Sequence, residues 1–256
     1  MAARYEIAMR EVRGFLPRPD GERLAVRAIA GAGPTVVWLG GFKSDMTGTK
    51  AEAIADWAAA TGRDYVRFDY FGHGASSGAF RDGTVTGWRA DALAVIDDLT
   101  QGDVVLVGSS MGGWLACLAA MVRPERVKAL VLIAPAPDFT EKLMTPEIPS
   151  EGHAALAADG VWLRPSEYGE PYPITRALLE DGARWSILGG APIPIDVPVR
   201  ILQGGQDPDV PWRHALELAT TLKGDDVVFS LIRDGDHRLS RPKDIARLIG
   251  TLEDVT

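Results

Sequence analysis

Apolar residues fall into short runs along most of the chain, and stretches with helical spacing separate these runs. Several runs are apolar at nearly every position, which is typical of strands buried on both faces. Such strands alternating with helices indicate an α/β fold, with a mostly parallel sheet and helices on both faces. We expect strands at 34–41, 64–70, 103–110, 127–136, 197–205 and 226–235, and helices at 48–62, 87–100, 111–122, about 211–222 and after Arg241.

The opening of the chain has a different pattern, in which polar residues border two predicted strands. We expect these strands at Tyr5 to Val12 and at Glu22 to Ile29. The residues between them include Pro17, Pro19 and Gly21, which favour a turn because proline and glycine suit turn geometries. Sheets of the predicted kind place their sites beyond the carboxyl ends of the strands, so we expect the functional residues of this chain there.

A stretch at about 138–191 interrupts the alternation of strands and helices. It is rich in proline and glycine, and an irregular insert of this length is usually a lid or a binding segment. Trp162, Tyr172 and Trp185 of the insert suggest a pocket for an acyl chain or an aromatic group. An equally reasonable interpretation is that these side chains anchor the insert to the core.

Length and composition favour one large soluble domain over the whole chain, 1–256, and we interpret the insert as a lid of this domain. The 256 residues are enough for one large core and few for two. The net charge of −8, without clustered Lys or Arg, argues against nucleic acid or an anionic membrane as partner. We see no secretory signal and no apolar stretch of membrane-spanning length, so we expect a cytoplasmic protein. The lone Cys117 permits no intramolecular disulfide.

The segment Gly108-Ser109-Ser110-Met111-Gly112 matches the pattern G-x-S-x-G at a predicted strand-to-helix junction. A strand that runs straight into a helix needs a tight turn, and the two glycines remove side chains that would clash there. Ser110 would then present its hydroxyl at the positive end of the helix dipole. The alternative is that Ser109 or Ser110 only caps the helix. We interpret Ser110 as a nucleophile.

A serine hydroxyl needs a neighbouring base, and the chain has four histidines. His237 follows the last predicted strand, where this type of fold would bring a loop over the nucleophile, so we predict that it is the base. His73 also follows a strand and is the main competitor, although its flanking glycines favour a hydrogen bond within a turn. His214 lies in a predicted helix and is expected at the surface, and His153 of the insert could touch substrate.

A carboxylate should orient the imidazole, and in this fold it lies between the serine and the histidine in the chain. Asp207 and Asp209 both follow the strand at 197–205. We favour Asp207 because it is nearer the strand end, in a tight turn. Asp209 is expected to face solvent or to cap the next helix. For the oxyanion we expect the backbone N–H of Met111 and of Phe42, which follows Gly40 and Gly41. An ordinary turn is the alternative at Phe42.

With these residues in place the chain resembles the α/β-hydrolase superfamily over nearly its whole length. The segments WLGGF, DYFGHGASSG, VGSSMGG, LIAPAPDF, GGQDPDVPW and DGDHRLS occur in the family's order and approximate spacing. The segment GGFKSDMTGTKA looks most like a narrower group, the bacterial relatives of a mitochondrial acyl-protein thioesterase that removes palmitoyl groups from cysteine and also cleaves acyl glucuronides. The resemblance implies an eight-stranded sheet, a Ser110–Asp207–His237 triad and an oxyanion hole at Phe42 and Met111.

The resemblance also implies hydrolysis of a small carboxylic ester or an acyl thioester through an acyl-enzyme, without a cofactor. We expect no metal, since no His, Asp or Glu cluster has ligand spacing, and a monomer or weak homo-oligomer. A peptidase is an alternative, with Glu147, Glu151, Glu167 or Glu170 of the insert as an anchor for an amino terminus. A cofactor-free haloperoxidase and a non-catalytic small-molecule receptor are further alternatives.

Overall fold

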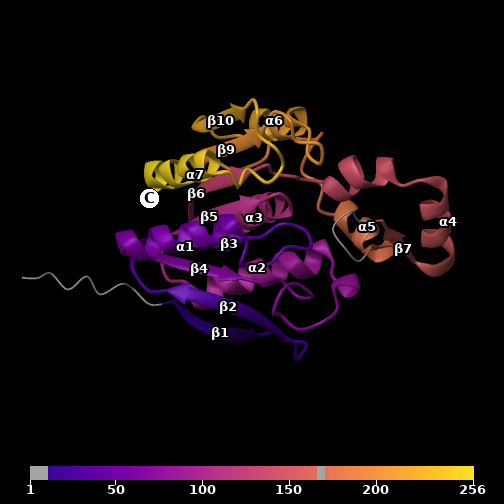
Figure 1. Cartoon of the computed structure of the whole chain (residues 1–256), viewed down its shortest axis with the longest axis horizontal. Helices are drawn as coiled ribbons and strands as arrows, with labels where there is room; N and C mark the ends of the chain where they lie inside the picture. Colours follow the sequence, from indigo (N-terminus) through magenta and orange to yellow (C-terminus); the bar gives the residue numbers. More distant parts are fainter. Residues whose placement is uncertain (1–10, 166–170) are drawn as a thin grey trace, which may run out of the picture.

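The computed structural model describes residues 11–165 and 171–256, and an eight-stranded sheet forms its centre. In space the strands follow the order β1-β2-β4-β3-β5-β6-β9-β10 (Figure 1). The pairs β1–β2 and β2–β4 are antiparallel, and every later neighbour is parallel. The strands are β1 (Val12–Pro17), β2 (Arg23–Ile29), β3 (Ala32–Leu39), β4 (Arg63–Phe68), β5 (Val104–Ser109), β6 (Val127–Ile133), β9 (Val199–Gly204) and β10 (Val227–Ile232).

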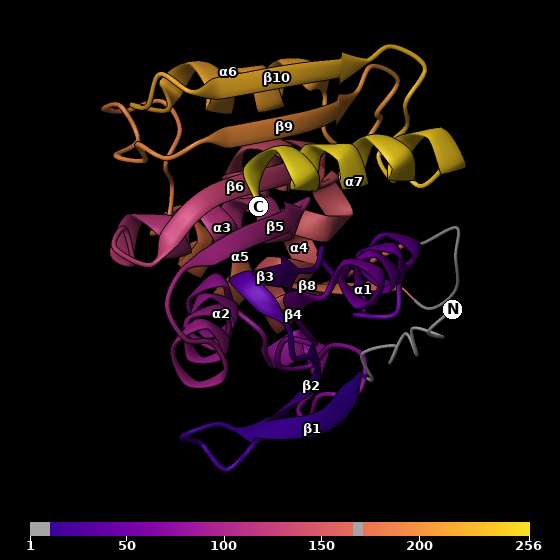
Figure 2. The same cartoon turned by 90° about the vertical axis from the view of Figure 1, so that its left-hand side faces the viewer.

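Helices cover both faces of the sheet, as Figure 2 shows in the view turned by 90°. One apolar layer joins the sheet to α2, α3 and α6, and a second layer joins it to α1 and α7. The mostly parallel, eight-stranded sheet expected from the sequence is therefore confirmed. The helices are α1 (Thr49–Thr61), α2 (Val85–Leu99), α3 (Met111–Val122), α6 (Trp212–Thr221) and α7 (Pro242–Val255), with one short 3₁₀ turn at Phe80–Asp82.

The central strands owe their position to apolar side chains on both faces. In β5 every residue is buried, and consecutive side chains alternate between the two layers. Cys117 of α3 is fully buried in the same core, and burial raises the pKa of its thiol to about 12. Among the described residues, no helix has the length and apolar content that a membrane crossing requires.

The first strand differs from its prediction. Most of the expected strand at Tyr5 to Val12 lies outside the described residues, and the strand that pairs with β2 runs from Val12 to Pro17. The turn comes at Arg18 to Glu22 and includes Pro19 and Gly21, which were expected to form it. Gly21 adopts a left-handed φ of 90° there. Pro17 ends an edge strand, where the missing N–H of proline removes no bond to a neighbouring strand.

Between β6 and β9 the chain leaves the sheet and forms elements of its own, to one side of the sheet in Figure 1. The expectation of an irregular insert is therefore wrong in detail. Gly160 ends one helix in a left-handed conformation, and the Thr175 hydroxyl caps the next by accepting the N–H of Leu178. Short elements punctuated by proline and glycine hide their periodicity. They are a π turn (Thr140–Met144), a 3₁₀ turn (Thr145–Glu147), α4 (Ser150–Asp159), the hairpin β7 (Val161–Arg164) with β8 (Tyr172–Thr175), and α5 (Arg176–Ala183).

One buried carboxylate ties the end of the insert to its beginning. Asp138, which has a left-handed φ of 54°, accepts the N–H groups of Ile187 and Leu188 and the hydroxyl of Ser186. The excursion thus returns to within hydrogen-bond distance of the place where it leaves the core.

Candidate active site

Ser110 lies at the junction of β5 and α3 in a backbone conformation that residues other than glycine rarely adopt. Its φ is 55° and its ψ is −118°, outside the helical and extended regions. A strained backbone at such a junction persists only where the surroundings hold it. Here the Ser110 N–H donates to the carbonyl of Ile133 at 2.9 Å, and its own carbonyl accepts from Gly113 and Ala136.

The two glycines of the motif are required by close backbone contacts. A Cβ at Gly108 would lie 2.4 Å from the carbonyl oxygen of Gly112, and one at Gly112 would lie 2.0 Å from the carbonyl oxygen of Leu39. Both distances are impossible for real atoms, so α3 can pack this tightly on β3 and β5 only with glycine. The turn leaves Ser110 partly exposed while Ser109 and Met111 are buried.

The loop after β3 lies directly against Ser110. A Cβ added at Gly41 would lie 3.4 Å from the Cβ of Ser110, so the backbone before Phe42 approaches the serine closely. The Phe42 ring packs against the rings of Phe80 and Phe139, with centroid distances of 4.9 and 5.4 Å. These three rings form an apolar aromatic wall beside the loop.

The buried side chain of His73 holds this loop through a hydrogen bond. Its Nε2 accepts the backbone N–H of Lys43 at 3.1 Å, and its Nδ1 faces the carbonyl of Phe71 at 3.1 Å. Nδ1 therefore carries the proton, since a carbonyl can only accept. Burial lowers the pKa of His73 to about 4, so the ring stays neutral above that pH and keeps Nε2 as an acceptor. Lys43 itself has a left-handed φ of 54°.

Asp207 and His237 come together from the loops after β9 and β10. The distance from His237 Nδ1 to Asp207 Oδ2 is 2.8 Å, and the Asp207 side chain is fully buried. His237 is about a quarter exposed, so its ring lies at the surface with one edge on the carboxylate. A donor at Nδ1 leaves Nε2 as the basic nitrogen of a neutral ring.

Further donors hold the Asp207 carboxylate in place. Oδ1 accepts the backbone N–H groups of Asp209 and Val210, at 2.9 and 2.8 Å. Oδ2 accepts the Gln203 side-chain amide at 3.1 Å, in addition to His237. These hydrogen bonds fix the orientation of the carboxylate.

The sheet brings the serine and the Asp207–His237 pair to the same edge. Ser109 is in register with Ile133 of β6, and Ile133 is in register with Leu202 of β9. The loops that carry the three side chains follow the carboxyl ends of β5, β9 and β10, which are parallel strands of this sheet. The general rule for site location in parallel sheets therefore holds here.

Some site contacts were not expected from the sequence. Lys50, at the start of α1, donates from Nζ to the carbonyl of Arg238, next to His237. Burial lowers the pKa of Lys50 to about 8, while the neighbouring Asp236 opposes that shift. A lysine in the first turn of a helix is unusual because the helix dipole disfavours cations there, and this was the available signal. Gln203 lies in β9, only four residues before Asp207, so its position at the strand end was the available signal.

His214 differs from its expectation, whereas Asp209 agrees with one of its two alternatives. His214 is buried rather than at the surface, and its Nε2 lies 2.7 Å from the carbonyl of Pro137, because α6 turns this side chain inward. Asp209 is exposed as expected, but α6 begins after Pro211, so Asp209 does not cap it. His153 is exposed on α4. Of the glutamates considered as anchors, Glu147 and Glu151 are exposed, and Glu167 and Glu170 lie outside the described residues.

Asp207, Asp209 and His237 place ligand-type atoms within 4.8 Å of one another, a group that sequence spacing did not indicate. Spacing could not reveal it, because the residues come from two loops that meet only in the fold. Both oxygens of Asp207 already accept hydrogen bonds from protein donors. The arrangement therefore fits an oriented imidazole better than a cation site.

The three aromatic residues of the insert occupy different places. The Tyr172 ring lies 4.4 Å from Lys43 Nζ, beside the loop that borders Ser110. Trp185 donates from Nε1 to the Thr86 hydroxyl, and its carbonyl accepts the Nε1 proton of Trp114. The third residue, Trp162, packs within the insert against Gly152, where an added Cβ would lie 3.0 Å from the ring.

Several known proteins are similar to this chain in sequence or in structure. A model of the alpha/beta hydrolase fold matches residues 38–164. Bovine palmitoyl-protein thioesterase ABHD10, a mitochondrial protein, is 40% identical over 94% of this chain and 79% of its own length. The human protein of the same name is 38% identical over the same shares.

Two solved structures agree with this grouping. A putative hydrolase from Agrobacterium vitis S4 superposes with a TM-score of 0.90 and 46% identity, covering 96% of this chain and 98% of the other. Mouse alpha/beta hydrolase domain-containing protein 10 gives a TM-score of 0.86 and 36% identity, covering 95% and 97%. The curated relatives are named mitochondrial proteins, which contradicts the cytoplasmic location expected from the sequence.

Proposed function

Because this chain belongs to the alpha/beta-hydrolase fold family, we propose that Ser110, His237 and Asp207 carry out its catalysis. The chain is an enzyme that hydrolyses acyl esters or thioesters, as its palmitoyl-protein thioesterase relatives indicate. The observation that carries the assignment is the strained Ser110 turn, which closely packed glycines enforce beside the loop of Phe42. A turn held at this cost is typical of a functional residue.

In this proposal His237 removes the proton from Ser110 as the hydroxyl attacks the acyl carbonyl. The contact between His237 Nδ1 and Asp207 sets the tautomer, so Nε2 is the atom that takes the proton. Protonated His237 then returns the proton to the departing alcohol or thiol. A water molecule, activated by the same imidazole, cleaves the acyl-serine and restores the enzyme.

The tetrahedral intermediate needs donors for its oxyanion, and the proposal assigns the N–H groups of Met111 and Phe42. Met111 is the first residue of α3, so its N–H has no carbonyl partner within the helix. The close approach of Gly41 to Ser110 supports Phe42, whose loop His73 holds through Lys43. No metal or cofactor is assigned a step.

For the acyl group, the proposal places an apolar subsite at the aromatic wall of Phe42, Phe80 and Phe139, with Tyr172 of the insert at its border. Trp162 and Trp185 are held by contacts within the insert and to α2, which supports an anchoring role for these two. The insert, about 138–191, is then the lid of a single-domain enzyme, and its substrate is a small ester or an acyl thioester.

A fluorophosphonate probe tests the nucleophile directly. The folded wild-type chain should be labelled, and Ser110→Ala should not be, while Ser109→Ala serves as the matched control and should retain labelling. Undiminished labelling of Ser110→Ala would refute the assignment, and a chain that is never labelled would favour a non-catalytic receptor.

A series of p-nitrophenyl esters and acyl thioesters of increasing chain length tests the substrate class. We expect kcat/KM to rise with chain length until the apolar subsite is filled, because each buried methylene adds about 0.8 kcal/mol to binding. A flat profile would contradict an acyl subsite. Activity on amides of peptides with a free amino terminus would instead indicate a peptidase.

A further inference from the structure

The last strand of the sheet, β10, leaves one edge open. It has β9 on one side, and no described strand pairs with its other side. Figures 1 and 2 show β10 near the upper margin of the molecule. Its six residues, Val227–Ile232, include no proline, glycine or charged residue. The opposite edge strand β1 contains Arg13, Gly14 and Pro17, which are features that discourage pairing with another chain.

The backbone direction along β10 shows which polar groups face outward. The carbonyls of Asp226 and Ile232 accept N–H groups from the β9 side, so even-numbered residues turn their backbone groups inward. Val227, Phe229 and Leu231 therefore direct their N–H and C=O groups away from the sheet. In the described part of the chain, no side chain or loop hydrogen-bonds to these outward groups.

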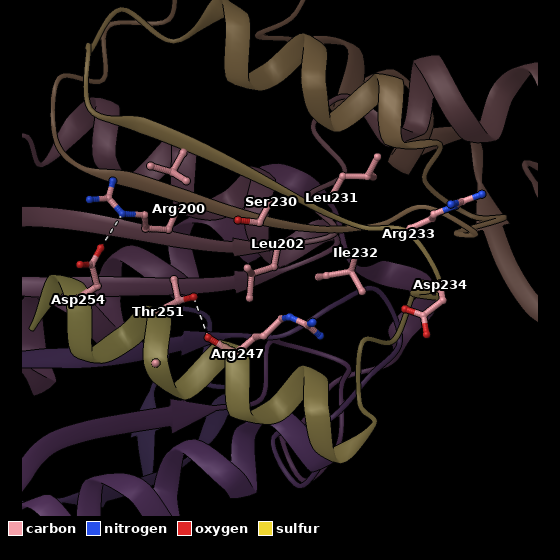
Figure 3. A pocket seen from close by; sticks show the side chains of 12 residues that line it. Arg200, Leu202, Ser230, Leu231, Ile232, Arg233, Asp234, Arg247, Thr251 and Asp254 are labelled. Carbon is pink, nitrogen blue, oxygen red and sulfur yellow. Dashed lines mark hydrogen bonds and ion pairs between the residues drawn. The ribbon is translucent and has the colours of Figure 1, made fainter.

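Apolar side chains accompany these open backbone groups. Val228 and Leu231 are each 46% exposed, on opposite faces of the strand. On the α7 side a groove of about 880 Å³ runs along β10, because α7 covers the neighbouring strands and stops short of this edge (Figure 3). Its floor includes Leu202, Ser230 and Ile232, and none of its lining residues belongs to the proposed triad.

Two opposite charges flank the strand. Asp225 precedes it and Arg233 follows it, and both are exposed. Neither residue forms an ion pair with another described residue. In Figure 3 the Arg233 side chain, at one end of the groove, extends away from α7. Asp225 lies at a bend just before β10 and Arg233 in the turn just after it, each four positions from Phe229.

We propose that β10 is the interface for a second copy of this chain, which pairs with it in the antiparallel direction. A two-fold axis perpendicular to the sheet and passing through Phe229 satisfies this arrangement. It pairs Phe229 with its own copy and Val227 with Leu231 of the other copy, so all outward N–H and C=O groups find partners.

The same axis makes the flanking charges complementary. Asp225 of each copy comes opposite Arg233 of the other, which gives two symmetry-related ion pairs. With the axis through Ser230 instead, the pairing shifts by two residues, and Asp225 and Arg233 no longer face each other. That register would also bring Asp226 opposite Asp234, and both carboxylates already have basic partners within the chain. The charges thus select the register centred on Phe229.

The resulting dimer has one continuous sheet with twice the strands of a single copy. The two-fold axis reverses strand direction, so the carboxyl edges that carry Ser110 point to opposite sides. Each copy therefore keeps its own complete site, and the interface is independent of catalysis.

Sedimentation velocity over a dilution series of the wild-type chain tests the proposal, and we expect a concentration-dependent dimer. Arg233→Asp should weaken dimerisation by about tenfold or more, because it creates two like-charge pairs. The exchange Asp225→Arg with Arg233→Asp should restore it. Leu231→Lys should also weaken the dimer, whereas Val12→Lys, on the exposed edge strand β1, is the matched control and should not.

Esterase activity of each variant, measured in dilute solution, reports correct folding and should equal that of the wild type. A wild-type chain that stays monomeric throughout the series would overturn the proposal. So would a dimer that persists unchanged in both Arg233→Asp and Leu231→Lys, because another surface would then join the copies.

Discussion

The loop after β4 and the loop after β10 each place a histidine at the carboxyl edge of the sheet, and the two histidines have opposite surroundings. His73 is buried, and both ring nitrogens face backbone groups. His237 is partly exposed, and one nitrogen lies on the Asp207 carboxylate. The first arrangement keeps a ring neutral and immobile, whereas the second leaves Nε2 as the basic nitrogen that the proposed role of His237 requires. Both histidines follow a strand of the sheet, and the structure distinguishes them by their partners.

The strongest test of this difference is to remove each ring in turn. We expect His237→Ala to lower kcat by about 10⁴-fold, since the nucleophile loses its base. Steady-state hydrolysis of a p-nitrophenyl ester measures the change. His153→Ala, at an exposed position of α4, is the control and should leave kcat unchanged. A larger loss from His73→Ala than from His237→Ala would reverse the assignment.

The carboxylate beside His237 should have the next largest effect. Asp207→Asn keeps the shape of the side chain but favours the wrong imidazole tautomer, so we expect kcat to fall by about 10³-fold. Asp209→Asn is the matched control, because its exposed carboxylate lies nearby without contacting the imidazole at hydrogen-bond distance, and it should change kcat little. The opposite ranking would identify Asp209 as the orienting acid.

The burial of His73 should appear in the pH dependence of stability. Its pKa is about 4 in the folded chain against 6.5 for the free side chain, so the unfolded state binds the extra proton between these values. Above pH 6.5 His73 therefore has no effect of this kind. As the pH drops to 4, its contribution lowers the free energy of unfolding by about 3 kcal/mol. His214, whose pKa burial also lowers, adds in the same direction.

Denaturant unfolding of wild type and His73→Gln at several pH values checks this effect. The contribution from His214 and from acidic groups such as Asp69 is common to both chains, so the difference isolates His73. Parallel pH profiles for the two proteins would contradict a buried, neutral imidazole.

The smallest effect concerns the support that His73 gives to the loop of Phe42. His73→Leu removes the acceptor for the Lys43 N–H, and we expect kcat to fall by about 10- to 100-fold with little change in KM, because the loop loses its alignment on the oxyanion. His73→Gln offers a carbonyl and an amide in the same place and should restore most of kcat. Equal losses in both variants would indicate a packing role only.

The sequence was sufficient for the sheet, the helices around it and the Ser110 turn, because these depend on local patterns. Apolar periodicity marks each buried strand, and glycine spacing marks the turn. It was insufficient where the outcome depends on contacts between distant segments. The inward direction of His214 and the contact of Lys50 with the His237 loop each require a partner from elsewhere in the chain. The Gln203 bond to Asp207 spans only four residues, but it depends on the shape of the turn between them.

The hydrophobic pattern also could not predict the boundaries of the first strand or the helices and strands of the insert. An edge strand such as β1 is half exposed, so its polar positions look like those of a loop. In the insert, elements of four to ten residues are too short for a helical or strand period to stand out.

The bond network of Asp138 has a consequence for how such enzymes could diversify. Because this carboxylate clasps the backbone at Ile187 and Leu188, the entropy of closing the excursion depends mainly on its two ends and only weakly on its length. Segments between those ends can therefore be lengthened, shortened or exchanged while the sheet and its chemistry stay intact. A single aspartate thus makes the insert a replaceable module.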